Sequence, residues 1–117
     1  MIKSVGLLTR KDGLSHEDFV KHWFEIHAPL AHAVPGVRRY VQSHILGERT
    51  RPDIPTTDVE IDGIAELWYD DLEAMERANA TPDAKRLHPA LLVLFNGFLA
   101  LVSIACLIGI WFGRVPA

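Results

Sequence analysis

The amino-acid sequence predicts one α+β domain whose elements follow the order βαββα. An apolar run over residues 2–9 ends in a charged turn, which is typical of a buried strand. Residues 37–46 and 61–69 alternate between two faces with the period of two that strands show. Apolar side chains recur at helical spacing before the second strand and after the third. At 117 residues, the chain has room for one domain and little more.

The first predicted helix begins after Ser15, which stands three residues before Asp18 in the spacing of a capping box. Its apolar residues follow at steps of four, three and four and form one stripe directed at a core: Phe19, Trp23, Ile26 and Leu30. Pro29 has no N–H to donate to a preceding carbonyl, so the helix is expected to kink or restart near Ala28. The Pro35-Gly36 pair ends the helix.

Each of the two later strands carries polar and aromatic side chains on one of its faces. On the second strand these are Tyr40, Gln42 and His44, and on the third they are Ile64, Glu66 and Trp68. The connection over residues 47–60 contains prolines and several charges, so it is expected to be exposed, either as a passive connection or as a lid. A second helix is expected from Asp70, as its cap, through Asn79.

Composition excludes several classes of site. The net charge of -3, with basic residues scattered along the chain, argues against nucleic acid as a partner. The single cysteine, Cys106, leaves no disulfide framework and no thiolate metal site. No two histidines stand four residues apart and no carboxylate cluster accompanies them, so no metal is predicted. Without a glycine-rich phosphate loop or dinucleotide fingerprint, no bound nucleotide or flavin is predicted either.

Several segments, in this order along the chain, resemble the EthD family: MIKSVGLLTRKDGLSHEDFVKHW at the start, HAPL at 27–30, PGVRRY at 35–40 and DGIAELW at 62–68. The resemblance covers about the first 87 residues, so residues 1–87 are interpreted as an EthD-like domain. It implies a ferredoxin-like βαββαβ unit with an antiparallel sheet, which pairs through its sheet into a dimeric α+β barrel. It also implies a pocket for a small organic molecule.

The resemblance leaves the reaction open. Members are linked to the degradation of ethers and other organic compounds, and relatives on the same fold include lactone isomerases, polyketide cyclases and small monooxygenases. We expect either a cofactor-independent enzyme, of proton-transfer or oxidative type, or an accessory protein of such a pathway. The alternative is a non-catalytic module that binds a hydrophobic ligand or docks a partner at the membrane.

His27 is the first candidate for an acid-base residue. It lies about 80° to one side of the helical stripe, near the bend at Pro29, where its side chain can reach a cavity between helix and sheet. A neutral imidazole can move a proton near pH 7, so activity is expected to rise through a pKa near 6 to 7. The alternative is a structural role, as a helix cap or as a hydrogen-bond partner of a core carbonyl.

Tyr40 is the second catalytic candidate, because it follows the Pro35-Gly36 turn and could orient a substrate carbonyl. A purely structural aromatic wedge is the alternative. We expect the substrate-binding residues to be Trp23, His44, Glu66 and Trp68, although both tryptophans could equally be core residues. Glu66 is interpreted either as a buried proton-accepting carboxylate or as half of an interface salt bridge.

The C-terminal segment departs from the family pattern, which would supply a short helix and a closing fourth strand. No side chain between Pro89 and Gly113 is charged, and a run of this length predicts a membrane helix with Trp111 near one end. Basic residues precede the run and only Arg114 follows it, which predicts a cytoplasmic domain anchored by this segment. The alternatives are a buried hairpin that turns at Asn96-Gly97, one strand of which closes the sheet, and a non-native tail.

Overall fold

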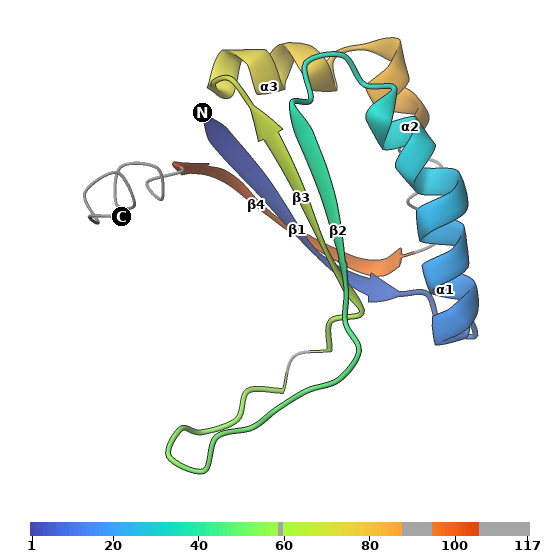
Figure 1. Ribbon diagram of the computed structural model, residues 1–117, viewed down its shortest axis with the longest axis vertical. Helices are drawn as coiled ribbons and strands as arrows, with labels where there is room; N and C mark the ends of the chain where they lie inside the picture. The colour runs from blue at the N-terminus through green and yellow to red at the C-terminus, as the bar shows by residue number, and fades with distance from the viewer. Residues whose placement is uncertain (59, 88–94, 106–117) are drawn as a thin grey trace, which may run out of the picture.

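The computed structural model describes residues 1–58, 60–87 and 95–105. Its elements are β1 Ile2–Arg10, α1 His16–His22, a π-helical turn η1 Trp23–His27, α2 Ala28–His32, β2 Arg39–His44, β3 Gly63–Tyr69, α3 Leu72–Asn79 and β4 Phe95–Ala105 (Figure 1). Residues 82–87 are also helical. The order of strands and helices is that of the predicted ferredoxin-like unit.

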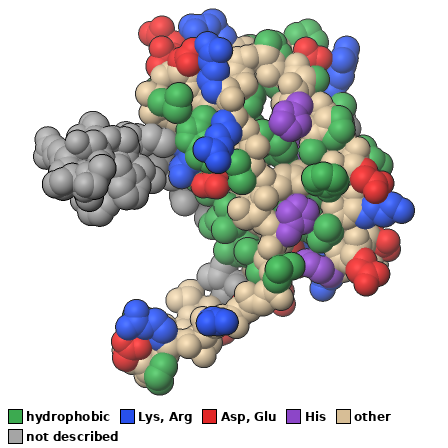
Figure 2. Space-filling model, in the orientation of Figure 1, with side chains coloured by type: hydrophobic (Ala, Val, Ile, Leu, Met, Phe, Trp, Pro, Cys, Tyr) green, Lys and Arg blue, Asp and Glu red, His purple; other side chains and the backbone are tan. Residues whose placement is uncertain are grey.

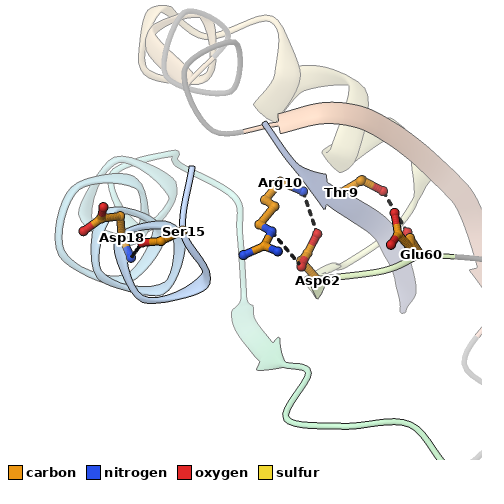
Figure 3. A network of polar contacts seen from close by, with 6 residues as sticks. All are labelled: Thr9, Arg10, Ser15, Asp18, Glu60 and Asp62. Carbon is orange, nitrogen blue, oxygen red and sulfur yellow. Dashed lines mark hydrogen bonds and ion pairs between the residues drawn. The ribbon is translucent and has the colours of Figure 1, made fainter. Parts of the chain in front are cut away.

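The four strands form one antiparallel sheet in the order β2-β3-β1-β4. The two central strands, β1 and β3, pair over seven residues, from Ile2 opposite Tyr69 to Leu8 opposite Gly63. Figure 3 shows how the chain before β3 is held against the end of β1. Asp62 accepts a hydrogen bond from the backbone N–H of Arg10 at 2.8 Å, and the Thr9 hydroxyl donates to the carbonyl of Glu60 at 2.8 Å.

The core lies on one face of the sheet, and the helices cover this face (Figure 1). One cluster joins Leu8 and Ala65 of the sheet to Phe19 and Trp23 of the first helical segment, with Tyr40 packed against it. A second cluster lies farther along the same face and contains Val34, Tyr69, Met75 and Ala78. The helix side of the sheet, where a site was expected, therefore carries both core clusters.

Local signals for the helix ends are confirmed. The Ser15 hydroxyl accepts a hydrogen bond from the N–H of Asp18 at 3.1 Å and caps α1 (Figure 3). A new α-helical segment begins at Ala28, where the sequence predicted a restart. The cap of α3 is Asp71, one residue later than predicted, because Asp70 pairs with the Arg38 guanidinium at 2.7 Å instead.

The expectation of a membrane helix between Pro89 and Gly113 is wrong. Residues 95–105 form β4, which pairs with β1 and closes the sheet on that side. Asn96 and Gly97 lie inside this strand, so they do not form the hairpin turn that was the alternative, although the predicted closing strand is present. No helix in the described ranges is long and apolar enough to cross a membrane. The remainder of the run, 89–94 and 106–113, lies outside the described residues.

The connection between β2 and β3 is exposed, as predicted. It extends away from the sheet as a long arm (Figure 1). Leu46 is 94% exposed and Ile54 is 52% exposed on this arm. A hollow of about 460 Å³ lies along this arm and is lined by residues from Ile45 to Ile61. This hollow does not border His27 or Tyr40.

Candidate functional site

The turn η1 sets the geometry of the helix that faces the sheet. In this turn the N–H of Ala28 donates to the carbonyl of Trp23, five residues back. Pro29 follows at once and has no N–H to offer, which disfavours regular α-helical bonding at this point. Single π-helical turns inside α-helices occur frequently at functional sites.

The wider turn changes which residues face the core. The buried positions recur at steps of four, as Phe19, Trp23, His27 and Ala31. Ile26 was expected in this stripe but is 51% exposed, and Leu30 is only half-buried. The α-helical spacing of the prediction was therefore wrong beyond Trp23, because one π-helical turn shifts the inward-facing stripe by one residue. His27 takes the place that was assigned to Ile26.

His27 is 6% exposed, far less than a flank position would be. Burial, and to a lesser degree the charge of His22, lower the pKa of His27 to about 4 from the ordinary 6.5. The imidazole is therefore neutral at pH 7 and can accept a proton. This pKa lies below the range of 6 to 7 expected from the sequence, because a helix flank was assumed and an interior position is found.

Gln42 of β2 connects three groups on this face of the sheet. Its amide Nε2 donates to the Trp23 carbonyl oxygen and to the Tyr40 hydroxyl oxygen, each at 2.9 Å. Its Oε1 lies 3.1 Å from Nε2 of His44. The strand is thereby tied to the π-helical turn through a single side chain.

Tyr40 is half-buried and lies against the helix at two points. Through Gln42 its hydroxyl is linked to Trp23, while its ring meets the His32 ring edge-on at 5.6 Å between centroids. His27 lies between Trp23 and His32 in sequence, on the buried side of the helix. Burial raises the pKa of Tyr40, and hydrogen bonds from Gln42 and from the Trp23 side chain oppose this rise. The phenol is therefore protonated at neutral pH.

His44 belongs to the same group. Its ring packs against the Trp23 indole with 4.7 Å between ring centroids. Burial, with a smaller contribution from His16, lowers the pKa of His44, so this ring is also neutral at pH 7. Figure 2 shows histidine side chains on the surface beside β2 and the helices. Trp23, Tyr40 and His44, three of the residues named from the sequence, therefore lie together, and their part in substrate binding stays a prediction.

Glu66 and Trp68 lie on the opposite face of the sheet. Tyr40 pairs with Leu67 and Val41 pairs with Glu66, and paired residues of an antiparallel sheet point to the same side. Glu66 forms a salt bridge with Lys3 at 3.1 Å, and Trp68 lies between the Lys3 ammonium and the Arg39 guanidinium. The six residues predicted from the sequence therefore divide into a helix-side group and an open-face group.

The described part of the chain contains no group of three or more His, Cys, Asp or Glu side chains that could hold a metal ion. On the helix side, the polar groups are two neutral imidazoles, a phenol and an amide. Such a set can donate and accept hydrogen bonds to a carbonyl compound and can move a proton.

Comparison with known proteins assigns the chain to a family. The model of the EthD domain matches residues 11–89. The chain belongs to the EthD domain family. A curated relative, the 4-carboxymethyl-4-methylbutenolide mutase of Pseudomonas reinekei, is 33% identical over 70 residues, which are 59% of this chain and 64% of the relative. The match therefore spans less than two thirds of that relative's length.

Solved structures share the fold of this EthD domain. A crystal structure of an EthD family protein from Bacillus halodurans C-125 has a TM-score of 0.71 at 22% identity, over 90% of this chain and 99% of that one. A dimeric ferredoxin-like protein of unknown function from Thermobifida fusca YX has a TM-score of 0.66 at 15% identity, over 88% and 90% of the two chains. At these identities the likeness establishes the ferredoxin-like fold alone.

Two residues of the candidate site were missed as candidates in the sequence. Gln42 was noted only as a polar strand residue, and its links to Trp23 and His44 depend on pairing between distant segments. Gly63 pairs with His44 across the strands, and a Cβ on it would lie 2.5 Å from Cζ3 of the Trp23 ring. A glycine at the start of a strand can indicate such a close approach, which is the one signal that the sequence offered.

Proposed function

We propose that this EthD domain is an isomerase for small lactones or related carbonyl compounds and works without a bound cofactor. In this proposal neutral His27 moves the proton and Tyr40 positions the carbonyl oxygen. The observation that carries the proposal is the interior position of His27 on the π-helical turn, in the helix that packs on the sheet face bearing Tyr40.

The chemistry follows from the protonation states. The neutral His27 ring takes a proton from a carbon next to the substrate carbonyl: the C–H bond breaks, an N–H bond forms, and the electron pair moves onto the carbonyl oxygen. The protonated Tyr40 hydroxyl donates a hydrogen bond to that oxygen as charge develops there. The same proton then returns to a different carbon, which shifts the double bond and restores the neutral imidazole.

The low pKa of His27 supports the return step. Desolvation makes the imidazolium an acid of pKa about 4, so it gives up the proton readily. The curated relative supports the substrate class, because its name describes a mutase that acts on a butenolide, an unsaturated lactone. An unsaturated lactone with a CH2 group next to its carbonyl has a carbonyl oxygen for Tyr40 and an acidic C–H for His27.

The test uses α-angelica lactone as the probe, an unsaturated lactone with a CH2 group next to its carbonyl, with NMR detection of the shift of its double bond. We expect turnover by the wild-type protein and a loss of about 10²-fold or more in His27→Ala, within the range that general acid-base groups contribute. The value of kcat/KM, which reports ionisation of the free enzyme, should fall as the pH drops through about 4, where His27 becomes protonated. Unaffected turnover in His27→Ala would remove this residue from the mechanism, and oxygen consumption would indicate the oxidative class instead.

The alternative is a non-catalytic EthD domain that holds a small hydrophobic ligand. The packing of Trp23 against His44 favours it, because stacked aromatic groups bind apolar ligands without any chemistry. Isothermal titration separates the two proposals. Binding of the butenolide without turnover, equal in the wild-type protein and in His27→Ala, would favour the binding module.

We also propose that two copies pair through the open faces of their sheets. Both described core clusters lie on the helix side, so the other face has no layer of its own, although it carries apolar residues such as Val41 and Ile64 besides Trp68. An uncovered apolar sheet face is usually buried against a second layer. The solved relative from Thermobifida fusca is itself described as dimeric, which supports a homodimer here.

A further inference from the structure

The Gln42 side chain has only one orientation that satisfies its neighbours. The carbonyl oxygen of Trp23 can only accept a hydrogen bond, and it lies 2.9 Å from the Gln42 amide nitrogen. An amide turned by 180° would bring two oxygens together at that position. The nitrogen therefore faces Trp23 and Tyr40, and Oε1 faces His44.

This orientation fixes the tautomer of His44. Gln42 Oε1 can only accept, so the His44 Nε2 that lies 3.1 Å away must carry a hydrogen. In a neutral ring the other nitrogen, Nδ1, then has a lone pair and accepts a proton or a hydrogen bond. The lowered pKa of His44, caused mainly by burial, favours the neutral ring at pH 7.

The same orientation directs the Tyr40 hydroxyl. The Gln42 amide nitrogen has no lone pair that accepts a hydrogen bond, so Tyr40 Oη accepts from it and cannot donate back. The hydroxyl proton of Tyr40 must therefore point away from the Gln42 amide nitrogen, and it can be offered to a ligand.

We infer that Gln42 is a positioning residue that makes Tyr40 a hydrogen-bond donor and makes Nδ1 of His44 an acceptor within the same site. The ligand class that fits this pair has a carbonyl oxygen for Tyr40 and a hydroxyl or acidic C–H group for His44. This part of the inference rests on the proposed function, whereas the tautomer of His44 and the direction of the Tyr40 proton do not.

Two substitutions separate the roles of Gln42. Gln42→Met keeps a similar length and removes every hydrogen bond, so it releases both His44 and Tyr40. Gln42→Glu has almost the same shape, and its carboxylate still accepts from Nε2 of His44 but now also accepts the Tyr40 proton. Because it also sets an oxygen against the Trp23 carbonyl, its activity is compared only after a urea midpoint shows that it is folded. The matched control is Ser43→Ala on the same strand, because Ser43 pairs with Ile64 and points to the opposite face.

The first readout is the tautomer of His44, measured at neutral pH by long-range 1H–15N correlation spectra of the ¹⁵N-histidine-labelled protein. The wild-type protein and Ser43→Ala should show the Nε2–H form, and Gln42→Glu should keep a hydrogen on Nε2. Gln42→Met should show a mixture of both tautomers. A wild-type ring with its proton on Nδ1, or an unchanged tautomer in Gln42→Met, would overturn the inference. Should Gln42→Met not fold, the wild-type spectrum and Gln42→Glu still decide the matter.

The second readout is turnover of α-angelica lactone. Gln42→Glu should lower kcat by about 10²-fold, the cost of losing one donor to a developing oxyanion, with a much smaller change in KM. Activity equal to that of Ser43→Ala would overturn the assignment of Tyr40 as a donor. If the tautomer responds as expected but the wild-type protein does not turn over this compound, the positioning role of Gln42 stands and the proposed function fails.

Discussion

The interior position of His27 predicts a specific dependence of stability on pH. In the native protein its pKa is about 4, and in the unfolded chain it returns to about 6.5. Between these values the unfolded state binds one more proton than the native state, so the free energy of unfolding falls as the pH drops from 6.5 to 4. One pKa unit corresponds to about 1.4 kcal/mol, and the total loss is roughly 3 kcal/mol.

The substitution that isolates this effect is His27→Gln, which keeps a polar side chain of similar size but does not titrate. His44 also has a lowered pKa, so it too lowers the free energy of unfolding as the pH falls. Because His44 is present in both proteins, its contribution cancels in the comparison. The difference in stability between wild type and variant therefore reports His27 alone. We expect the wild-type advantage at pH 7 to shrink by roughly 3 kcal/mol at pH 4 and to be constant above pH 7.

Urea unfolding at fixed protein concentration, from pH 4 to pH 8, measures this difference. With a slope of about 1–3 kcal/mol per molar urea, the effect is on the order of 1–3 M in the midpoint. The control is Ser43→Ala on β2, which removes no titratable group and should keep the pH dependence of the wild type. A gap between wild type and His27→Gln that does not change with pH would show that His27 titrates normally, and the neutral interior base would be refuted.

Other predictions concern the packing, the open face and the last strand. Gly63→Ala should lower the free energy of unfolding by about 1–3 kcal/mol, because the new methyl group meets the Trp23 ring. The control, Gly47→Ala, meets nothing within 4 Å and should change it by less than about 0.5 kcal/mol. Urea midpoints compare the two variants, and equal effects would contradict the close approach. Trp68→Asp should convert the proposed dimer into a monomer in sedimentation velocity, and a persistent dimer would exclude this face as the interface. Removal of residues 95–117 should lower the Tm and cause aggregation in light scattering, because β1 becomes an exposed edge; an unchanged Tm would mean that β4 adds no stability.

The parts of the fold that were predicted correctly depend on short-range chemistry. The cap by Ser15 and the helix restart at Ala28 involve residues within one turn of each other, so the local sequence contains the whole cause. The strands were found for the same reason, since alternation is a property of a few consecutive residues. The family resemblance then supplied the topology, which no local pattern contains.

The errors come from interactions between distant segments. An uncharged run of this length is compatible with a membrane helix or with a long buried strand, and only the pairing of β4 with β1, about ninety residues earlier, decides between them. The strand itself has 11 residues, longer than the usual five or six, which made the composition resemble that of a membrane segment. The division of the six candidate residues between two faces likewise required the register of β2 against β3.

The shift from Ile26 to His27 has a different cause. A stripe drawn at α-helical spacing assumes one uniform helix, and the sequence between Trp23 and Pro29 does not specify a π-helical turn on its own. The proline removes one donor, and the Trp23 carbonyl that accepts from Ala28 in the π-helical turn also accepts from Gln42 of the sheet. The site and the helix irregularity therefore depend on the same tertiary contact.

Trp23 consequently serves the fold and the site together. Its indole fills the space above Gly63 and packs on His44, and its carbonyl receives Gln42. A substitution of Trp23 would remove core packing and release the π-helical turn, so a loss of activity in such a variant could not be assigned to chemistry. Gln42 and His44 lie on the strand side and are only partly buried, so substitutions there can alter proton positions while the core remains intact. The function of this site is therefore best tested from β2.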